Sequence, residues 1–244
     1  ELGGLCAEAC GSELNAVSFE LACRGMRLWP EDYDLVRSAL QLAAFVLERI
    51  SAGGGMLADF VAQVGRAIRS HPPLAEFAQS PLSSIGPPAL SRVYEAPAAC
   101  TALHDMMPEI VRCLPSEAAG YHPASMWGLL TMLAESWPAP LALEMVAAGV
   151  VTKTCEAMWE EIHVHGVDAE SEDFCYVAEG MKLLVVLVRR FGAHVVADIP
   201  QQHQALLEYI HGLRGHDLQE DVAAAVHEFL DGALQDAPSD RLGD

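Results

Sequence analysis

Carboxylate and imidazole side chains recur at helical spacing in the second half of the chain. Glu160 and His163 form one Glu-x-x-His pair, and Glu208 and His211 form another. Residues three apart on a helix share a face, so each pair could offer a carboxylate oxygen and an imidazole nitrogen to a metal ion. A metal site is therefore the first chemical hypothesis to weigh.

Composition and helix direction both argue against that site. Glu144 precedes the first pair and Glu179 lies between the pairs, an order that resembles the ligand set of ferritin-like di-metal bundles. Chance alone gives roughly one such pair at this Glu and His content. Bundle ligands must also point inward, whereas the predicted apolar side of each helix lies opposite its Glu and His. For 151–163 that apolar side consists of Val151, Cys155, Met158, Trp159 and Ile162. We expect no metal and no cofactor.

Other signatures of catalysis are missing from the sequence. It contains no G-x-S-x-G, G-x-x-x-x-G-K-[ST], G-x-G-x-x-G or H-E-x-x-H motif. Cys155 and His163 could act as nucleophile and base, but eight residues along one helix separate them by about 12 Å of rise. The segment 163–173, "HVHGVDAESED", is expected to be an exposed acidic loop rather than a metal site. We therefore expect a protein that is not an enzyme.

Charge and hydropathy restrict the class of partner. The net charge is −20, from 34 acidic against 14 basic residues. Such a surface repels phosphate backbones, so we expect no nucleic-acid partner. A protein with a basic surface, or a basic or extended peptide, is the natural complement, and solubility alone is the alternative explanation. The longest candidate for a membrane span, 181–188, is too short and contains Lys182.

Cysteine usage bears on the compartment. The seven cysteines are scattered, odd in number and form no C-x-x-C motif. This pattern is typical of reduced thiols in an intracellular, reducing compartment, either the cytoplasm or the interior of an organelle. Whether a targeting segment precedes Glu1 is left open.

Apolar periodicity predicts an all-α protein. The helix expected over 12–28 carries apolar positions at Leu14, Val17, Leu21 and Met26. Pro108 is expected to open a helix, because proline suits a first helical turn. We expect N-terminal helices over 1–70, a Pro-rich irregular connection over 71–97 and further helices over 98–236, which together form one continuous domain. Individual helices are expected over 12–28, 31–50, 56–70, 98–107, 108–114, 124–136, 141–149, 151–163, 175–191, 201–214 and 217–234.

One stretch resembles an armadillo repeat. In 125–163 a long helix is followed by a short one, and Gly149 in "AAGVV" turns the chain into a third helix. Weaker echoes cover 38–70 and 177–214. The resemblance implies an armadillo-like or HEAT-like α-solenoid, in which stacked units bury one another's apolar faces. An irregular multi-helix domain is the alternative.

Three classes of function follow from these features. The first is a non-enzymatic helical-repeat protein that binds another protein, as an adaptor or scaffold or as an accessory subunit of a larger assembly. A helical ligand- or cofactor-binding domain and an enzyme without a recognisable signature are the alternatives. In armadillo-like stacks the third helix of each unit lines the binding face. The resemblance therefore assigns partner binding to Asp59, Gln63, Arg66, Glu156, Glu160, His163, Gln204, Glu208 and His211.

Overall fold

The structure is a computed structural model, in which every regular element of the described residues is a helix. The prediction of an all-α protein is therefore confirmed. The chain divides into two compact units: unit 1 is Glu1–Cys113 with Ser136–Glu144, and unit 2 is Leu114–Glu135 with Met145–Asp244. The described residues are 2–47, 54–83, 97–114, 124–164, 166–168, 171, 174–196, 199, 203–215, 218 and 220–233.

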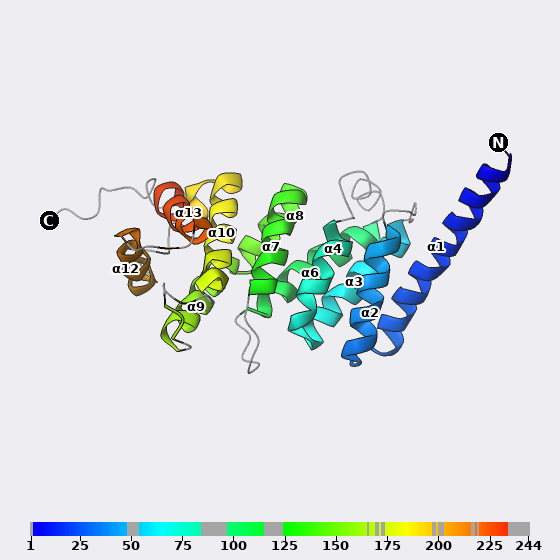
Figure 1. Cartoon of the computed structure of the whole chain (residues 1–244), viewed down its shortest axis with the longest axis horizontal. Helices are drawn as coiled ribbons and strands as arrows, with labels where there is room; N and C mark the ends of the chain where they lie inside the picture. The colour runs from blue at the N-terminus through cyan, green and yellow to red at the C-terminus, as the bar shows by residue number, and fades with distance from the viewer. Residues whose placement is uncertain are drawn as a thin grey trace. The chain divides into compact units, whose positions relative to one another are not determined.

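Unit 1 is built on a helical hairpin and the helices that cover it. Helix α1 packs against α2 and α3, α2 packs against α4, and α3 packs against α6 (Figure 1). The ring of Phe19 on α1 stands 5.2 Å from that of Phe60 on α3, and both rings are fully buried. The helices of this unit are α1 (Leu2–Leu28), α2 (Tyr33–Leu47), α3 (Gly54–Ser70), the 3-10 turn η1 (Pro72–Leu74), α4 (Ala75–Ser83), α6 (Pro97–Arg112) and the first part of α8 (Ala139–Ala147).

Among the described residues of unit 1, Pro81 and Pro108 lie in the interior of helices. The prediction that Pro108 opens a helix is wrong, because α6 runs without interruption from Pro97 to Arg112. Pro81 lies inside α4, so the first part of the predicted Pro-rich connection is a helix packed on α2. The remainder of that segment, 84–96, lies outside the described residues.

Unit 2 is organised around α10. This helix packs against α9, α13 and the turns η2 and η4, and α12 packs against α9 (Figure 1). At Gly180 the neighbours come so close that a β-carbon would lie 2.8 Å from the side chain of Met158 on α9 and 3.2 Å from Trp127 on α7. The helices are α7 (Ala124–Ser136), α9 (Val150–His163), α10 (Phe174–Phe191), η2 (Ala193–Val196), α12 (Gln204–Gly212), η3 (Leu213–Gly215), α13 (Glu220–Glu228) and the π-helical turn η4 (Phe229–Ala233).

The turn into α9 has the predicted backbone. Gly149 has a φ of 82°, in the left-handed region that glycine adopts without a steric penalty. Its N–H donates to the carbonyl of Val146 at 3.0 Å, and its own carbonyl accepts from the N–H of Lys153 at 3.1 Å. The glycine therefore both ends α8 and caps the start of α9.

Among the described residues, no helix combines the length and apolar character that a membrane crossing requires.

Candidate interaction surface

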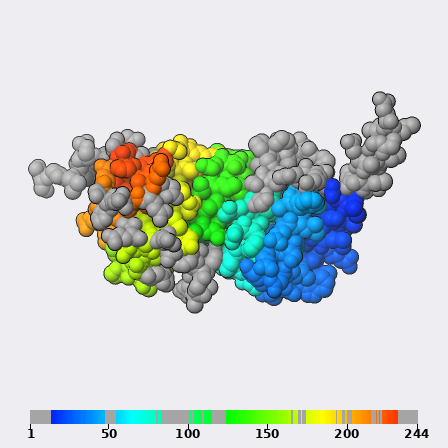
Figure 2. Space-filling view, viewed as in Figure 1, coloured from blue at the N-terminus to red at the C-terminus, as the bar shows by residue number. Residues whose placement is uncertain are grey.

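The outward face of α1 carries a row of large apolar side chains that the fold leaves in solvent. Leu14, Val17, Leu21 and Leu28 are 67%, 53%, 59% and 53% exposed. Their spacing of three, four and seven residues keeps them on one side of the helix. We call these four residues, with the exposed Arg24 between them, the α1 stripe. Figure 2 shows the described part of α1 in dark blue at the edge of unit 1. Contiguous exposed apolar surface of this kind marks interaction sites.

The opposite face of α1 is what holds the helix to its unit. Phe19, Ala22, Cys23 and Met26 are at most 3% exposed. Arg27 adds an ion pair to Asp59 on α3. Because the apolar contacts lie on this face, rotating α1 to bury the stripe would bring Phe19 and Met26 into water. The outward direction of the stripe is therefore set by the core of unit 1.

A glycine allows α2 to come close to α1. A β-carbon at Gly25 would lie 3.2 Å from Cδ2 of Leu35, so α2 approaches the backbone of α1 at this point. The N–H of Trp29 donates to the carbonyl of Gly25 at 3.0 Å, and the chain then turns into α2. This close packing of α2 against α1 helps to hold α1, and with it the stripe, in place on unit 1.

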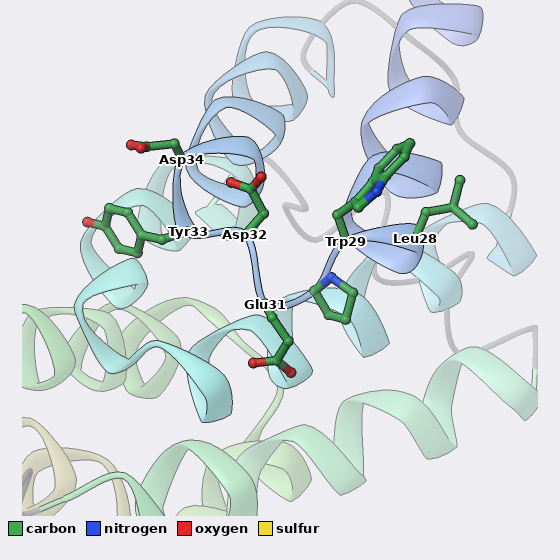
Figure 3. A pocket seen from close by; sticks show the side chains of 7 residues that line it. Leu28, Trp29, Glu31, Asp32, Tyr33 and Asp34 are labelled. Carbon is green, nitrogen blue, oxygen red and sulfur yellow. The ribbon is translucent and has the colours of Figure 1, made fainter.

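An open hollow of about 600 Å³ lies at the turn between α1 and α2. Figure 3 shows the ring of Tyr33 and the indole of Trp29 on opposite sides of this turn, with Asp32 between them. Trp29 is 54% exposed, and Leu28 belongs to both the hollow and the stripe. An exposed tryptophan next to leucines provides the kind of anchor that dominates binding energy at interfaces. The hollow is lined by the consecutive residues Leu28, Trp29, Pro30, Glu31, Asp32, Tyr33 and Asp34.

The acidic residues of the hollow already have structural partners. Asp32 caps α2, because its Oδ1 accepts from the N–H of Leu35 at 3.0 Å. Asp34 pairs with Arg37 at 3.1 Å, and the same guanidinium lies 5.8 Å from the centre of the Tyr33 ring. Asp32 and Asp34 therefore serve to stabilise the first turn of α2. We interpret the hollow as an extension of the stripe and not as a separate cation site.

The predicted partner-binding residues of α3 do not all face outward. Gln63 is only 3% exposed, so the prediction that its side chain faces a partner is wrong. Its Nε2 donates to Oδ1 of Asp59 at 3.2 Å, and its Oε1 accepts from Arg66 at 3.4 Å. Asp59 is also engaged by Arg27, which leaves Arg66 as the exposed member of the three.

The predicted residues of α9 and α12 are mostly exposed. On α9, Glu156 and His163 are exposed and Glu160 is half-buried. The imidazole of His163 stacks on the indole of Trp159, with ring centres 5.2 Å apart and planes 10° apart. This stacking holds the last turn of α9 in a defined arrangement.

On α12, all three predicted residues are exposed. Nε2 of Gln204 donates to Oε1 of Glu208 at 2.7 Å, and His211 lies one turn further along the helix. Since α9 and α12 pack against each other, their polar sides belong to the same unit. Their role in binding a partner stays a prediction.

The described residues contain no group of three His, Cys, Asp or Glu side chains that could hold a metal ion. The two Glu-x-x-His pairs lie on α9 and α12, where Glu208 and both histidines are exposed. They therefore lack the inward direction that a di-metal bundle needs.

Cys155 is a poor candidate for nucleophilic chemistry. Its side chain is fully buried, and this burial, with a smaller contribution from Glu156, raises the pKa of the thiol to about 12. Burial likewise raises the pKa of Cys23 to about 12, with Asp59 adding to the effect. A thiol must ionise to attack, so both remain inert near neutral pH.

The sequence contains a signal for the α1 stripe that periodicity alone could not interpret. Residues 14, 17, 21 and 28 follow a heptad spacing, but Phe19, Ala22, Cys23 and Met26 form a second apolar row on the same helix.

Comparison with known proteins finds no matching family model, no matching curated protein and no matching solved structure.

Proposed function

We propose that the protein is a non-enzymatic helical protein that binds another protein, as an adaptor or scaffold or as an accessory subunit of a larger assembly. The α1 stripe carries this proposal. Each leucine that moves from full exposure to full burial contributes roughly 1.5–3 kcal/mol, so a helix laid along the stripe would gain from several of them. Trp29, at the end of the row, supplies an aromatic anchor.

The armadillo-like interpretation of 125–163 is part of the same proposal. The order α7, α8 and α9, with Gly149 at a φ of 82° between the last two, supports it. The weaker echoes correspond to α2 with α3 and to α10 with α12. Stacked helical hairpins of this kind present extended surfaces to partners.

Charge favours a protein partner over nucleic acid. A net charge of −20 opposes binding to phosphate backbones and favours a partner with basic segments. The exposed acids of α9 and α12 form a second surface that such a partner could contact. Cys23 and Cys155 are buried free thiols, in keeping with our proposal of an intracellular, reducing compartment.

Affinity capture from native lysate with a matched control tests the proposal. Leu21→Lys places a charge in the middle of the stripe, where Leu21 is 59% exposed. Leu143→Lys makes the same change at a leucine of α8 that is 45% exposed and outside the stripe. We expect Leu21→Lys to lose stoichiometric partners that wild type and Leu143→Lys retain, with equal helix content by circular dichroism. Equal capture by all three proteins would overturn the proposed binding surface.

A further inference from the structure

We infer, resting on the proposed function of the α1 stripe, that the stripe binds a second copy of this chain, with the two α1 helices antiparallel. The apolar positions, the position of the one basic residue among them and the neighbouring acidic residue together specify this occupant. Most homodimers have two-fold symmetry, which requires a surface that is complementary to itself.

The spacing of the stripe is that of a two-helix seam. Leu14, Leu21 and Leu28 are seven residues apart, and Val17 and Arg24 lie three residues after the first two. In a heptad these are successive a and d positions, which face a partner helix along a narrow seam. The stripe covers fourteen residue steps along α1, or about 21 Å. Since the inner face of α1 is occupied by the core of unit 1, this outer seam is available to a second helix.

Charge selects the orientation of the two helices. Arg24 is an exposed residue within the row, and Glu20 is an exposed residue one turn before it. In a parallel pair the same positions meet, so Arg24 would oppose Arg24 of the second copy, and like charges at that distance repel. In an antiparallel pair an a position lies opposite a d position of the other helix, which avoids this contact.

The antiparallel register pairs Val17, Leu21, Arg24 and Leu28 of the two copies, and Leu14 extends beyond the end of the other copy's α1. This register places Leu21 opposite Arg24 of the second copy and Val17 opposite Leu28 of the second copy. The aliphatic stem of Arg24 then covers Leu21 of the second copy. The guanidinium group of Arg24 reaches Glu20 of the second copy. Two-fold symmetry repeats each contact, so one seam contains two Glu20–Arg24 ion pairs.

Sedimentation equilibrium of the full chain measures this association directly. We expect a reversible monomer–dimer equilibrium at micromolar concentrations, because the seam is short. Leu21→Lys should raise the dimer dissociation constant by tenfold or more, since two-fold symmetry places each new lysine opposite Arg24 of the other copy. Leu143→Lys, at an exposed leucine of α8, is the matched control and should leave the constant unchanged.

Charge reversal tests the identity of the occupant. Glu20→Arg alone gives an arginine opposite Arg24 of the second copy, and Arg24→Glu alone gives a glutamate opposite Glu20 of the second copy. Each variant should therefore dimerise at least about tenfold more weakly than wild type. An equimolar mixture of the two variants restores both ion pairs in the mixed dimer, so we expect its dissociation constant to return to about the wild-type value.

The results separate this inference from the proposed function. Monomeric wild type across the concentration range, or a mixture that stays as weak as its components, overturns the second-copy inference. If either result is found and Leu21→Lys still abolishes partner capture, the proposed function stands and only the second-copy inference is wrong. Circular dichroism of every variant shows whether a loss of dimer reflects the seam or the fold, and the restored mixture requires folded chains in any case.

Discussion

The close contact at Gly180 allows a sharp test of the packing in unit 2. Gly180 lies in the middle of α10 and is buried. A β-carbon there would lie 2.8 Å from both Cγ and Sδ of Met158 and 3.2 Å from Cε2 of Trp127. Met158 and Trp127 are both fully buried, so neither side chain can move into solvent to make room. Gly180→Ala therefore adds one methyl group to a filled space.

Two opposing effects set the size of the change. Alanine in a helix interior is favoured over glycine by about 1 kcal/mol. An extra methyl group in a packed core costs about 1–3 kcal/mol, because neighbours must leave their preferred rotamers. The net expectation is that Gly180→Ala lowers the free energy of unfolding by about 1 kcal/mol. Gly212→Ala is the matched control, because no atom lies within 4 Å of a β-carbon at the end of α12. It should be neutral or stabilising by up to about 1 kcal/mol.

Urea unfolding followed by far-ultraviolet circular dichroism measures both variants. The double variant with Met158→Ala adds a second comparison. Met158→Ala alone should cost about 2–5 kcal/mol, because it leaves a cavity. The cavity accepts the new methyl group, so the double variant should be destabilised by less than the sum of the two single changes. If Gly180→Ala is as stabilising as Gly212→Ala, or if the two changes at the contact are additive, the close approach of α7, α9 and α10 is not as described.

Three further results are expected. Gly149→Val should lower the free energy of unfolding by about 1–3 kcal/mol, because a β-branched residue is strained at a φ of 82°. Urea unfolding should show a smaller loss for Gly149→Asn, and equal stability of the valine variant would contradict the turn. Cys155 should stay unlabelled by N-ethylmaleimide in native protein at pH 8 and react after unfolding, as read by peptide mass spectrometry. Burial raises the pKa of the Cys155 thiol from 9.0 to about 12. The stabilisation of the folded state that goes with this raised pKa is therefore complete below pH 9 and is lost as the pH rises towards 12. Glu156→Lys with Glu160→Lys should weaken partner capture at low salt with helix content intact, and capture that is unchanged and equally strong at high salt would exclude that surface.

Local backbone chemistry was the most predictable part of the fold. Gly149 was placed at a sharp turn from sequence, and its positive φ confirms that conformation. The prediction that Pro108 opens a helix is wrong, because Pro108 lies inside α6. Sequence alone could not show that α6 continues through it, since packing against α3 can outweigh the loss of one hydrogen bond.

The direction of helix faces was less predictable than their existence. On α1, Leu14, Val17 and Leu21 form as good an apolar row as the buried one, and the positions of α2 and α3 decide which row is covered. On α9 the predicted apolar side was correct for Cys155 and Met158 but included Ile162, which is half-buried, whereas the neighbouring Glu161 is only 5% exposed. Periodicity gives the angle between side chains, but the identity of the neighbouring helix is a property of the tertiary fold.

The division into units has a practical consequence for dissecting the protein. The chain passes from unit 1 to unit 2 after Cys113, returns at Ser136 and leaves again after Glu144, inside α8. No single cut therefore yields two fragments that each hold one complete unit. A fragment ending at Cys113 would lack the last nine residues of unit 1, and its complement would carry them without the rest of that unit. Substitutions in the core of one unit, which leave every residue of the other unit in place, are therefore better suited than truncation for asking what each unit does.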